Sequence, residues 1–181
     1  MNMRWTVHGS RSVYCSPWVN VRLDDVELPS GTRVDHHVIE FPKPSVGAVV
    51  TDDNQRVLLL WRHRHITDAS GWEIPAGWAE PGENLADAVG REIKEETGYV
   101  AQSLQPIAEY HPLSGISTMT YTVFRGTDVV QDGGEPDTDE TEKVAWFTSE
   151  EVRELLRGGR IVDGPSLTAI SYFLAVQADP Q

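Results

Sequence analysis

The chain has 181 residues, a length that suits one globular domain with a small appendage, and its apolar fraction of 39% is sufficient for a packed core. Its formal net charge is −13. This charge argues against binding of nucleic acid or anionic membranes, because both need cationic patches on the protein. An anionic substrate would therefore need local cations or a bound metal ion.

Three features bear on location. The first residues lack the unbroken apolar stretch of a signal peptide, and the aliphatic run VLLLW is far too short to span a bilayer. Cys15 is the only cysteine, so no intramolecular disulfide can form. We expect a soluble, cytoplasmic protein.

The first third of the chain is predicted to be β-structure. The pattern predicts a hairpin in residues 4–14, followed by two alternating strands joined by the turn sequence PSG. The sequence PKP then interrupts the pattern. We expect a domain boundary there, between an N-terminal β-sheet in residues 1–44 and a main domain in residues 45–181.

The main domain begins with two apolar segments, residues 45–51 and 56–63, which are predicted to form a buried hairpin. The further predicted elements are a helix at 85–96, strands at 104–111, 119–125 and 143–147, and helices at 149–157 and 166–178. This order is typical of an α+β fold rather than of alternating βαβ units.

The segment GWAEPGENLADAVGREIKEETGY, residues 77–99, places acidic residues on the apolar side of a helix. Asn84 can cap this helix and Gly98 can end it. At 100° per residue, Glu92 and Glu96 lie about 20° to either side of the helix's first leucine. Solvated glutamates would lie on the opposite side, and like charges four residues apart repel one another.

These carboxylates require a cation. Arg91 can pair with Glu83 or Glu95, but it projects about 100° away from Glu92. A divalent cation can neutralise the set, and ligands that are all oxygen favour Mg²⁺ or Mn²⁺ over zinc. The alternative interpretation is a solvated acidic helix face.

The same segment resembles the signature of the Nudix hydrolase family, G-x5-E-x7-R-E-U-x-E-E-x-G-U, in which U is a bulky aliphatic residue. The matching positions are Gly77, Glu83, Arg91, Glu92, Ile93, Glu95, Glu96 and Gly98. Only the last U differs, because Tyr99 stands there. The resemblance implies an α/β/α sandwich with a mixed sheet, in which the loop–helix–loop segment binds Mg²⁺ and supports hydrolysis of nucleoside diphosphates linked to another moiety.

The resemblance also implies roles for individual residues. The implied metal ligands are the carbonyl oxygen of Ala76 and the carboxylates of Glu92, Glu95 and Glu96, with Glu95 close to the chemistry. Glu83 and Arg91 would hold the loop against the helix, as part of the catalytic apparatus. Gly77 would provide the tight backbone approach at the mouth of the site.

The flanking sequence resembles the ADP-ribose and nucleotide-sugar pyrophosphatase subgroup. The run WEIPAGWAEPGE is similar to the subgroup's E-x-PAG-x-x-E-x-GE pattern, and the resemblance places Glu73 among the substrate-binding residues. The run LLLWRHRHI resembles a strand whose arginine reaches the substrate's phosphates. That arginine aligns with Arg64, and Arg62 lies two residues earlier on the same strand face. A solvated strand end and a zinc pair formed by the two histidines are the alternatives.

Both ends of the chain extend the resemblance. The N-terminal residues match in length an extra sheet that the subgroup uses for dimerisation and for covering the nucleobase, which predicts a homodimer and makes Trp18 a candidate for base stacking. The tail GGRIVDGPSLTAISYFL is similar to the subgroup's ending. The stretch HPLSGISTM departs from it, with Ser114 in place of a proline and Met119 in place of a glutamate. This departure argues against ADP-ribose itself as the substrate, but it does not argue against the wider class of nucleotide sugars.

The implied reaction is attack of water on one phosphorus of a nucleoside diphosphate sugar, which yields NMP and a sugar phosphate. It needs a general base, which the subgroup takes from an acidic loop after the helix. The stretch QDGGEPDTDETE supplies candidates within residues 132–142. Glu140 aligns best, with Glu135 and Asp139 as alternatives, and a solvated acidic loop is the other interpretation.

Two other functions compete with this one. Nudix enzymes that remove damaged (d)NTPs are generally shorter and lack an N-terminal sheet. Non-catalytic Nudix modules that sense a nucleotide usually lose glutamates of the signature, whereas every one is present here.

Overall fold

The computed structural model describes residues 3–134 and 137–176, and the chain forms two compact units. The smaller unit contains the chain up to Pro44 together with His111–Thr120. The larger unit contains Ser45–Tyr110 and the chain from Tyr121 onward. The boundary expected from the sequence places His111–Thr120 in the main domain instead.

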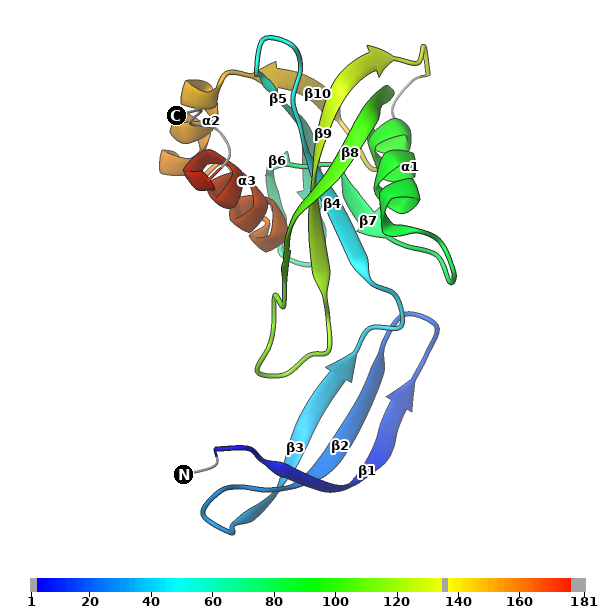
Figure 1. The fold of residues 1–181 in the computed structure, drawn as a ribbon, viewed down its shortest axis with the longest axis vertical. Helices are drawn as coiled ribbons and strands as arrows, with labels where there is room; N and C mark the ends of the chain where they lie inside the picture. The colour runs from blue at the N-terminus through cyan, green and yellow to red at the C-terminus, as the bar shows by residue number, and fades with distance from the viewer. Residues whose placement is uncertain (1–2, 135–136, 177–181) are drawn as a thin grey trace. The chain divides into compact units, whose positions relative to one another are not determined.

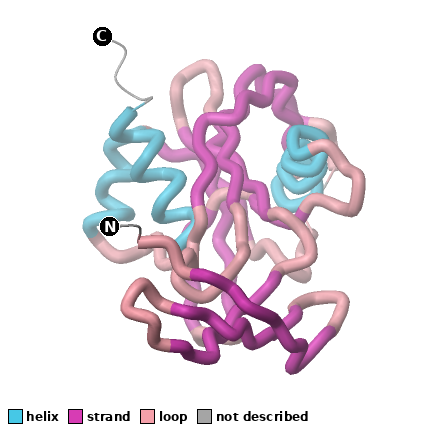
Figure 2. The backbone as a smooth tube through the Cα atoms, turned by 60° about the horizontal axis from the view of Figure 1, so that its bottom comes forward, coloured by secondary structure: helices cyan, strands magenta, loops and turns pink. Residues whose placement is uncertain are grey.

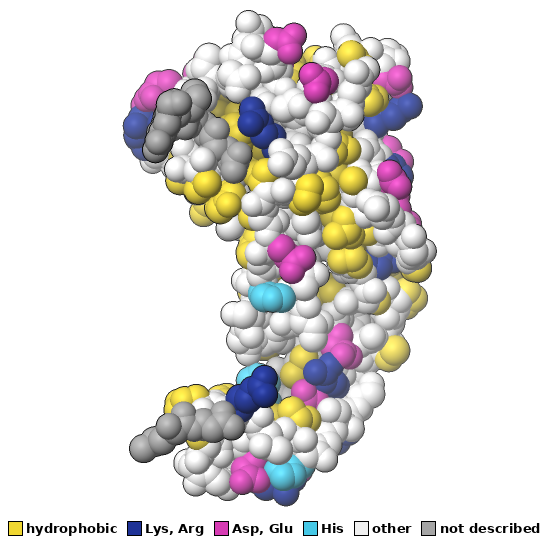
Figure 3. All heavy atoms as spheres, viewed as in Figure 1, with side chains coloured by type: hydrophobic (Ala, Val, Ile, Leu, Met, Phe, Trp, Pro, Cys, Tyr) yellow, Lys and Arg dark blue, Asp and Glu magenta, His cyan; other side chains and the backbone are white. Residues whose placement is uncertain are grey.

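The smaller unit is built on an antiparallel sheet with the strand order β1–β2–β3 (Figure 1). Its strands are β1 (Thr6–Cys15), β2 (Asn20–Glu27) and β3 (Arg33–Glu40). Acidic, basic and histidine side chains are interspersed on the face of this unit that Figure 3 shows. Charged side chains of this unit also form ion pairs, such as Arg22–Asp24 at 2.8 Å.

The predicted hairpin in residues 4–14 is wrong, because most of this segment belongs to the single strand β1. Two irregularities in its pairing with β2, between Val7 and Gly9 and between Ser12 and Tyr14, shift the register. A bulge adds a residue without reversing the chain. The small polar residues that suggested a turn therefore lie within a strand.

The segment His111–Thr120 lies along the outer edge of β3. The Ile39 N–H donates to the Ile116 carbonyl at 2.8 Å, and the Thr118 N–H donates to the Ile39 carbonyl at 3.0 Å. These bonds satisfy backbone groups that an edge strand would otherwise expose.

The larger unit contains two sheets. Their orders are β7–β4–β9–β8 and β10–β5–β6. The strands are β4 (Ser45–Val50), β5 (Val57–Arg64), β6 (Ala69–Glu73), β7 (Ala76–Trp78), β8 (Tyr99–Tyr110), β9 (Tyr121–Gln131) and β10 (Lys143–Phe147). The first sheet is mixed, because β4 pairs in parallel with β9 and antiparallel with β7.

Helices cover both sides of these sheets. They are α1 (Leu85–Thr97), α2 (Ser149–Arg157) and α3 (Gly164–Val176). Figures 1 and 2 show α1 on one side of the strands, with α2 and α3 on the other. The predicted α/β/α sandwich with a mixed sheet and an additional N-terminal antiparallel sheet is confirmed. Within the described residues, no helix combines the length and apolar character needed to cross a bilayer.

The predicted hairpin of residues 45–51 and 56–63 is wrong in its pairing. β4 is buried throughout and β5 over most of its length, as expected. The two strands nevertheless belong to different sheets, and only an isolated bridge between Thr51 and Val57 joins their ends. Strands that are apolar on both faces carry no alternation, so their pattern does not identify their neighbours.

The helix that bears the acidic residues begins and ends close to its predicted bounds. The Asn84 side chain accepts from the Ala86 N–H at 2.8 Å, and Gly98 adopts the left-handed conformation with φ 72°. The buried face of α1 packs on the mixed sheet through an apolar cluster that includes Val46, Ala48, Ala88, Val89, Ile93 and Phe124. This packing fixes the rotation of α1 and therefore the depth of each glutamate on it.

Candidate active site

The three glutamates of the last turns of α1 lie at different depths. The Glu96 side chain is 4% exposed and that of Glu92 14%, whereas that of Glu95 is 56% exposed. Glu96 thus lies on the buried side of the helix, in line with Val89 and Ile93. The apolar stripe of the sequence predicted this position.

Arg62 on β5 faces Glu96. One guanidinium nitrogen, Nη2, forms an ion pair with Glu96 Oε1, and the Ala76 N–H donates to Oε2 at 2.8 Å. Arg62 is itself only 6% exposed, so solvent screens this pair little. Burial raises the pKa of Glu96 to about 7, even though Arg62 acts in the opposite direction.

The acidic loop before β10 reaches the same point. Arg62 Nη2 lies 3.0 Å from Glu140 Oε2, and Arg62 Nε donates to the Glu140 carbonyl at 3.0 Å. The Asp137 N–H donates to the Glu95 carbonyl at 3.0 Å, which attaches the loop to the end of α1. The structure therefore brings Glu140 together with Glu96 through one arginine.

The other two base candidates differ from Glu140. Asp139 is exposed, and its N–H bonds to the Asp137 side chain at 2.9 Å within the loop. Glu135 lies outside the described residues.

Arg91 joins the loop before α1 to the helix. It donates to the two carboxylate oxygens of Glu83 at 3.2 and 3.3 Å and to the Trp78 carbonyl at 2.9 Å. It also contacts Glu92 at 2.8 Å and Glu95 at 3.1 Å. The contact with Glu92 corrects the expectation drawn from the helical angle. That angle describes the direction of Cβ, whereas a long arginine side chain can bend toward its neighbour.

Gly77 on β7 leaves the space that the Glu92 carboxylate occupies. A Cβ at Gly77 would lie 2.2 Å from both Cδ and Oε1 of Glu92. No side chain fits there unless Glu92 or the strand moves. Burial raises the pKa of Glu92, against the influence of Arg91.

Arg64 and Glu73, both predicted to bind substrate, bind one another. Arg64 donates from Nε and Nη2 to the two oxygens of Glu73 at 3.0 and 2.5 Å, between the antiparallel strands β5 and β6. Burial lowers the pKa of Arg64, but Glu73 more than offsets this and the pKa is raised. The Arg64 side chain is 45% exposed and that of Glu73 2%, so Glu73 anchors an arginine that solvent still reaches.

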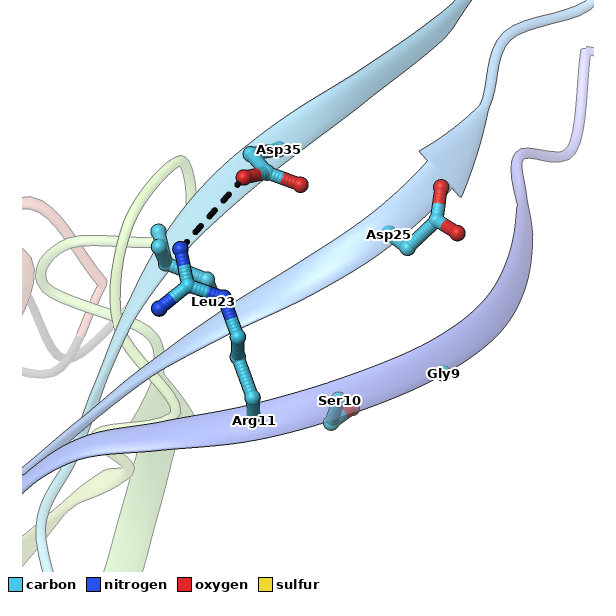
Figure 4. A pocket seen from close by; sticks show the side chains of 6 residues that line it. All are labelled: Gly9, Ser10, Arg11, Leu23, Asp25 and Asp35. Carbon is cyan, nitrogen blue, oxygen red and sulfur yellow. Dashed lines mark ion pairs between the residues drawn. The ribbon is translucent and has the colours of Figure 1, made fainter.

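Trp18 lies in the smaller unit, between β1 and β2, and is 68% exposed. A hollow in the same unit does not involve it. The residues that line this hollow are Gly9, Ser10, Arg11, Leu23, Asp25 and Asp35 (Figure 4). Arg11 and Asp35 pair at 3.6 Å, and the lining provides no aromatic ring for a base to stack on.

No group of three acidic, histidine or cysteine side chains in the described part of the chain is arranged to hold a metal ion. The carboxylates of Glu92 and Glu96 are turned instead toward Arg91 and Arg62. The donor set still fits a hard divalent cation, because its side-chain donors are carboxylate oxygens and burial disfavours the charge on two of them. The alternative, a zinc site at His63 and His65, is not supported by a third ligand among the described residues. His63 Nε2 instead lies 3.2 Å from Asp68 Oδ1.

Sequence reasoning missed the function of Arg62 as the partner of Glu96 and Glu140. The sequence does contain a signal, since the resemblance places Arg62 and Arg64 on one strand face. That signal shows that two arginines share the face, but it does not show which of them turns to the helix.

Comparison with known families accounts for this arrangement. Residues 41–168 match the family model of the NUDIX domain. The chain belongs to the Nudix family. Residues 5–39 of this Nudix protein match a second model, the nucleoside diphosphate sugar hydrolase N-terminal domain.

Individual Nudix relatives are similar over most of the chain. The CMP-5'-(N-acetyl-N-hydroxy-3-aminopropyl)phosphonate hydrolase of Streptomyces rubellomurinus is 37% identical over 162 residues, which cover 88% of this chain and 77% of that protein. The ADP-ribose pyrophosphatase of Mycobacterium tuberculosis is 31% identical over 163 residues, which cover 87% and 76%. The crystal structure of an ADP compounds hydrolase superimposes with a TM-score of 0.80 at 20% identity, over 95% of this chain and 92% of that one, and supports the fold.

Proposed function

We propose that this Nudix enzyme hydrolyses the diphosphate linkage of ADP-ribose or of a related nucleoside diphosphate sugar, and releases NMP and a sugar phosphate. The observation that carries the proposal is that Arg62 binds both Glu96, from a Nudix signature that keeps all its glutamates, and Glu140 from the acidic loop. The names of two relatives, which specify nucleotide-containing substrates, support this substrate class. The match of residues 5–39 to an N-terminal domain of nucleoside diphosphate sugar hydrolases supports it further.

Nudix hydrolases in general need a divalent cation, and for this chain we propose Mg²⁺, for which Mn²⁺ can substitute. Its ligands are the Ala76 carbonyl and the carboxylates of Glu92, Glu95 and Glu96. When bound, the metal neutralises charge on the diphosphate as the transition state forms. Carboxylate donors support this choice, since hard cations prefer oxygen.

The protein's own groups have distinct roles in this hypothesis. Glu140 takes a proton from the attacking water. The oxygen of this water forms a bond to one phosphorus, and the bond between that phosphorus and the bridging oxygen breaks. Arg64, oriented by Glu73, binds the phosphates through its exposed side. Glu83 and Arg91 hold the loop in place, so that Gly77 stays close to Glu92.

We propose that residues 45–181 are the hydrolase domain and that the N-terminal sheet, residues 1–44, forms the homodimer. We also propose that this sheet covers the nucleobase, with Trp18 as the stacking residue. Exposed apolar side chains on or beside β1 support an interface: Trp5, Val7, Val13 and Tyr14. Light scattering measures the mass in solution, and the mass of a monomer would refute the proposed homodimer. A cytoplasmic location, without nucleic acid or membrane partners, agrees with the net charge of −13.

The experiment that tests the function is turnover of ADP-ribose, ADP-glucose, GDP-mannose, NADH and dNTPs with Mg²⁺, with the products separated by chromatography. We expect NMP and a sugar phosphate from at least one diphosphate sugar. Release of pyrophosphate and NMP from dNTPs alone would favour the house-cleaning enzyme. Tight binding of a nucleotide sugar without turnover would favour the sensing module.

A further inference from the structure

Arg62 connects two segments that the reaction needs together. It contacts the side chain of Glu96 on α1, and both the side chain and the carbonyl of Glu140 in the acidic loop. It is 6% exposed, and Glu96 is 3% exposed. A buried guanidinium between two carboxylates can be a permanent structural ion pair, or it can occupy the place of another cation that binds the same carboxylates.

We propose that Arg62 is the resident counter-cation of the metal site: it holds Glu96 when no metal is bound, yields Glu96 to a divalent cation, and retains Glu140. Arg62 is then a positioning residue that couples occupancy of the metal site to placement of the general base. This proposal rests on the proposed function for the role of Glu140, but its first half concerns metal binding alone.

The bonds of Glu96 show why the cation must be exchanged. Its Oε2 accepts from the Ala76 N–H, and its Oε1 is taken by Arg62. A divalent ion cannot share Oε1 with the guanidinium at contact distance, because the two positive charges repel one another in a site that solvent barely screens. Nor can Glu96 remain ionised without a cation, since it is almost fully buried.

The bonds of Arg62 show why it can leave Glu96. Nε and Nη2 reach the carbonyl and the carboxylate of Glu140, so the guanidinium still has an anionic partner when Glu96 is withdrawn. A planar fork can hold two acceptors at once, which a lysine ammonium cannot do in the same geometry. Release of Glu96 therefore leaves Glu140 tethered.

Backbone bonds hold the loop independently of Arg62. The Asp137 N–H bonds to the Glu95 carbonyl at 3.0 Å, and the Glu142 N–H bonds to the Trp61 carbonyl at 3.0 Å. Loss of the Arg62 side chain should thus free Glu140 without detaching the loop from α1 and β5. The effect on the base is separable from a general loss of structure.

Three roles for Arg62 predict different results. A counter-cation competes with the metal, so its removal tightens metal binding and lowers kcat. A purely structural pair supports the site, so its removal weakens metal binding. A ligand of the substrate's phosphates, the role that the resemblance allowed, raises KM when it is removed.

The test uses Arg62→Met and Arg62→Lys, with Arg56→Met as the matched control. Arg56 lies just before the same strand and pairs with Asp52 at 2.7 Å, away from the signature residues. Mn²⁺ and Mg²⁺ binding is titrated by calorimetry without substrate. Hydrogen exchange of the amides of residues 138–141 is followed by mass spectrometry. The kinetic constants kcat and KM are measured on the diphosphate sugar that is turned over.

For Arg62→Met we expect the metal Kd to fall by at least about threefold, because a competing positive charge is lost. Amide exchange at residues 138–141 should rise, and kcat should fall by at least about tenfold with little change in KM. Arg62→Lys keeps the charge but not the fork, so its metal Kd should stay near the wild-type value while kcat falls. Arg56→Met should match the wild type in all three measurements.

An unchanged or weaker metal affinity in Arg62→Met would overturn the proposal, and a rise in KM at constant kcat would assign Arg62 to the substrate. If Arg62→Met does not fold, Arg62→Met combined with Glu96→Gln removes both buried charges. In that background, exchange at residues 138–141 that matches the wild type would refute the tether. If the wild type hydrolyses no diphosphate sugar, the proposed function fails, whereas the metal titration still decides the exchange of cations.

Discussion

At the residue scale, the depth of a carboxylate in this site follows from its partner. Glu96 stays buried because Arg62 and the Ala76 N–H each take one of its oxygens. Glu92 is held between Arg91 and the backbone of Gly77, which has no side chain to displace it. Each of these contacts can be removed by one substitution, which makes the assignments testable one residue at a time.

Glu140→Gln should lower kcat by at least about a hundredfold with little change in KM, because the amide cannot take the proton of the attacking water. Steady-state kinetics on the best diphosphate sugar provide the measurement. Glu142→Gln, in the same loop, is the matched control and should leave turnover unchanged. Normal turnover in Glu140→Gln, with a loss in Asp139→Asn, would move the base to Asp139.

Gly77→Ala should weaken Mg²⁺ binding and lower kcat by about tenfold or more, because the new methyl group displaces the Glu92 carboxylate. The Mg²⁺ concentration for half-maximal rate reports the first effect. Gly115→Ala is the control, since no heavy atom lies within 4 Å of a Cβ there. Wild-type metal dependence in Gly77→Ala would show that Glu92 is not a ligand.

At the element scale, local signals located the helices well and the strand pairings poorly. The Nudix helix could be predicted because a cap at each end and a 3.6-residue repeat are written in neighbouring residues. The helix Ser149–Arg157 was predicted for the same reason, and Thr148 and Glu151 form the complete capping box. The partners of β4 could not be predicted, since a buried strand can pair with any other apolar strand.

Thr148→Ala should lower the free energy of unfolding by about 1 kcal/mol, because the first turn of α2 loses its cap. Urea denaturation followed by circular dichroism measures this loss. Ser149→Ala, at the adjacent, half-buried position, should change stability by less than about 0.5 kcal/mol, because the Ser149 side chain makes no capping bond. An equal loss in both variants would show that the capping bond contributes nothing specific.

The β-sheet of the smaller unit should carry a pH-dependent stability. Asp24 is buried, and its hydrogen bond with Arg22 lowers its pKa below the ordinary value of 3.8. The ionised form is thus favoured by folding, so its contribution is complete above pH 3.8 and is lost as the pH falls through the lower folded value.

Asp24→Asn should therefore melt at a lower temperature than the wild type at pH 7, and the difference should shrink as the pH is lowered below 3.8. Thermal melting of both proteins from pH 7 to pH 3 provides the test. A difference that is constant over this range would show that Asp24 contributes through packing and not through its charge.

At the scale of the whole molecule, the net charge of −13 leads us to expect that a bound cation stabilises the fold, in addition to the role in catalysis proposed for it. Folded protein that binds Mg²⁺ is stabilised by about 2.7 kcal/mol when the free ion is at a hundredfold its Kd. We expect a higher melting temperature with Mg²⁺, and loss of activity with EDTA that Mg²⁺ restores. Glu92→Gln combined with Glu96→Gln should lose the Mg²⁺-dependent shift, and a shift that persists would place the ion elsewhere.

The sequence by itself determined the family, the position of the Nudix helix and which of its glutamates lie on the apolar side. These properties depend on residues within a few turns of one another, and a helical repeat converts their spacing directly into geometry. The tertiary structure alone decided that Arg62 meets both Glu96 and Glu140, that Arg64 meets Glu73, and that β4 and β5 enter different sheets. These contacts join segments distant in the chain, and which apolar surfaces pack together is a property of the folded core rather than of any local pattern.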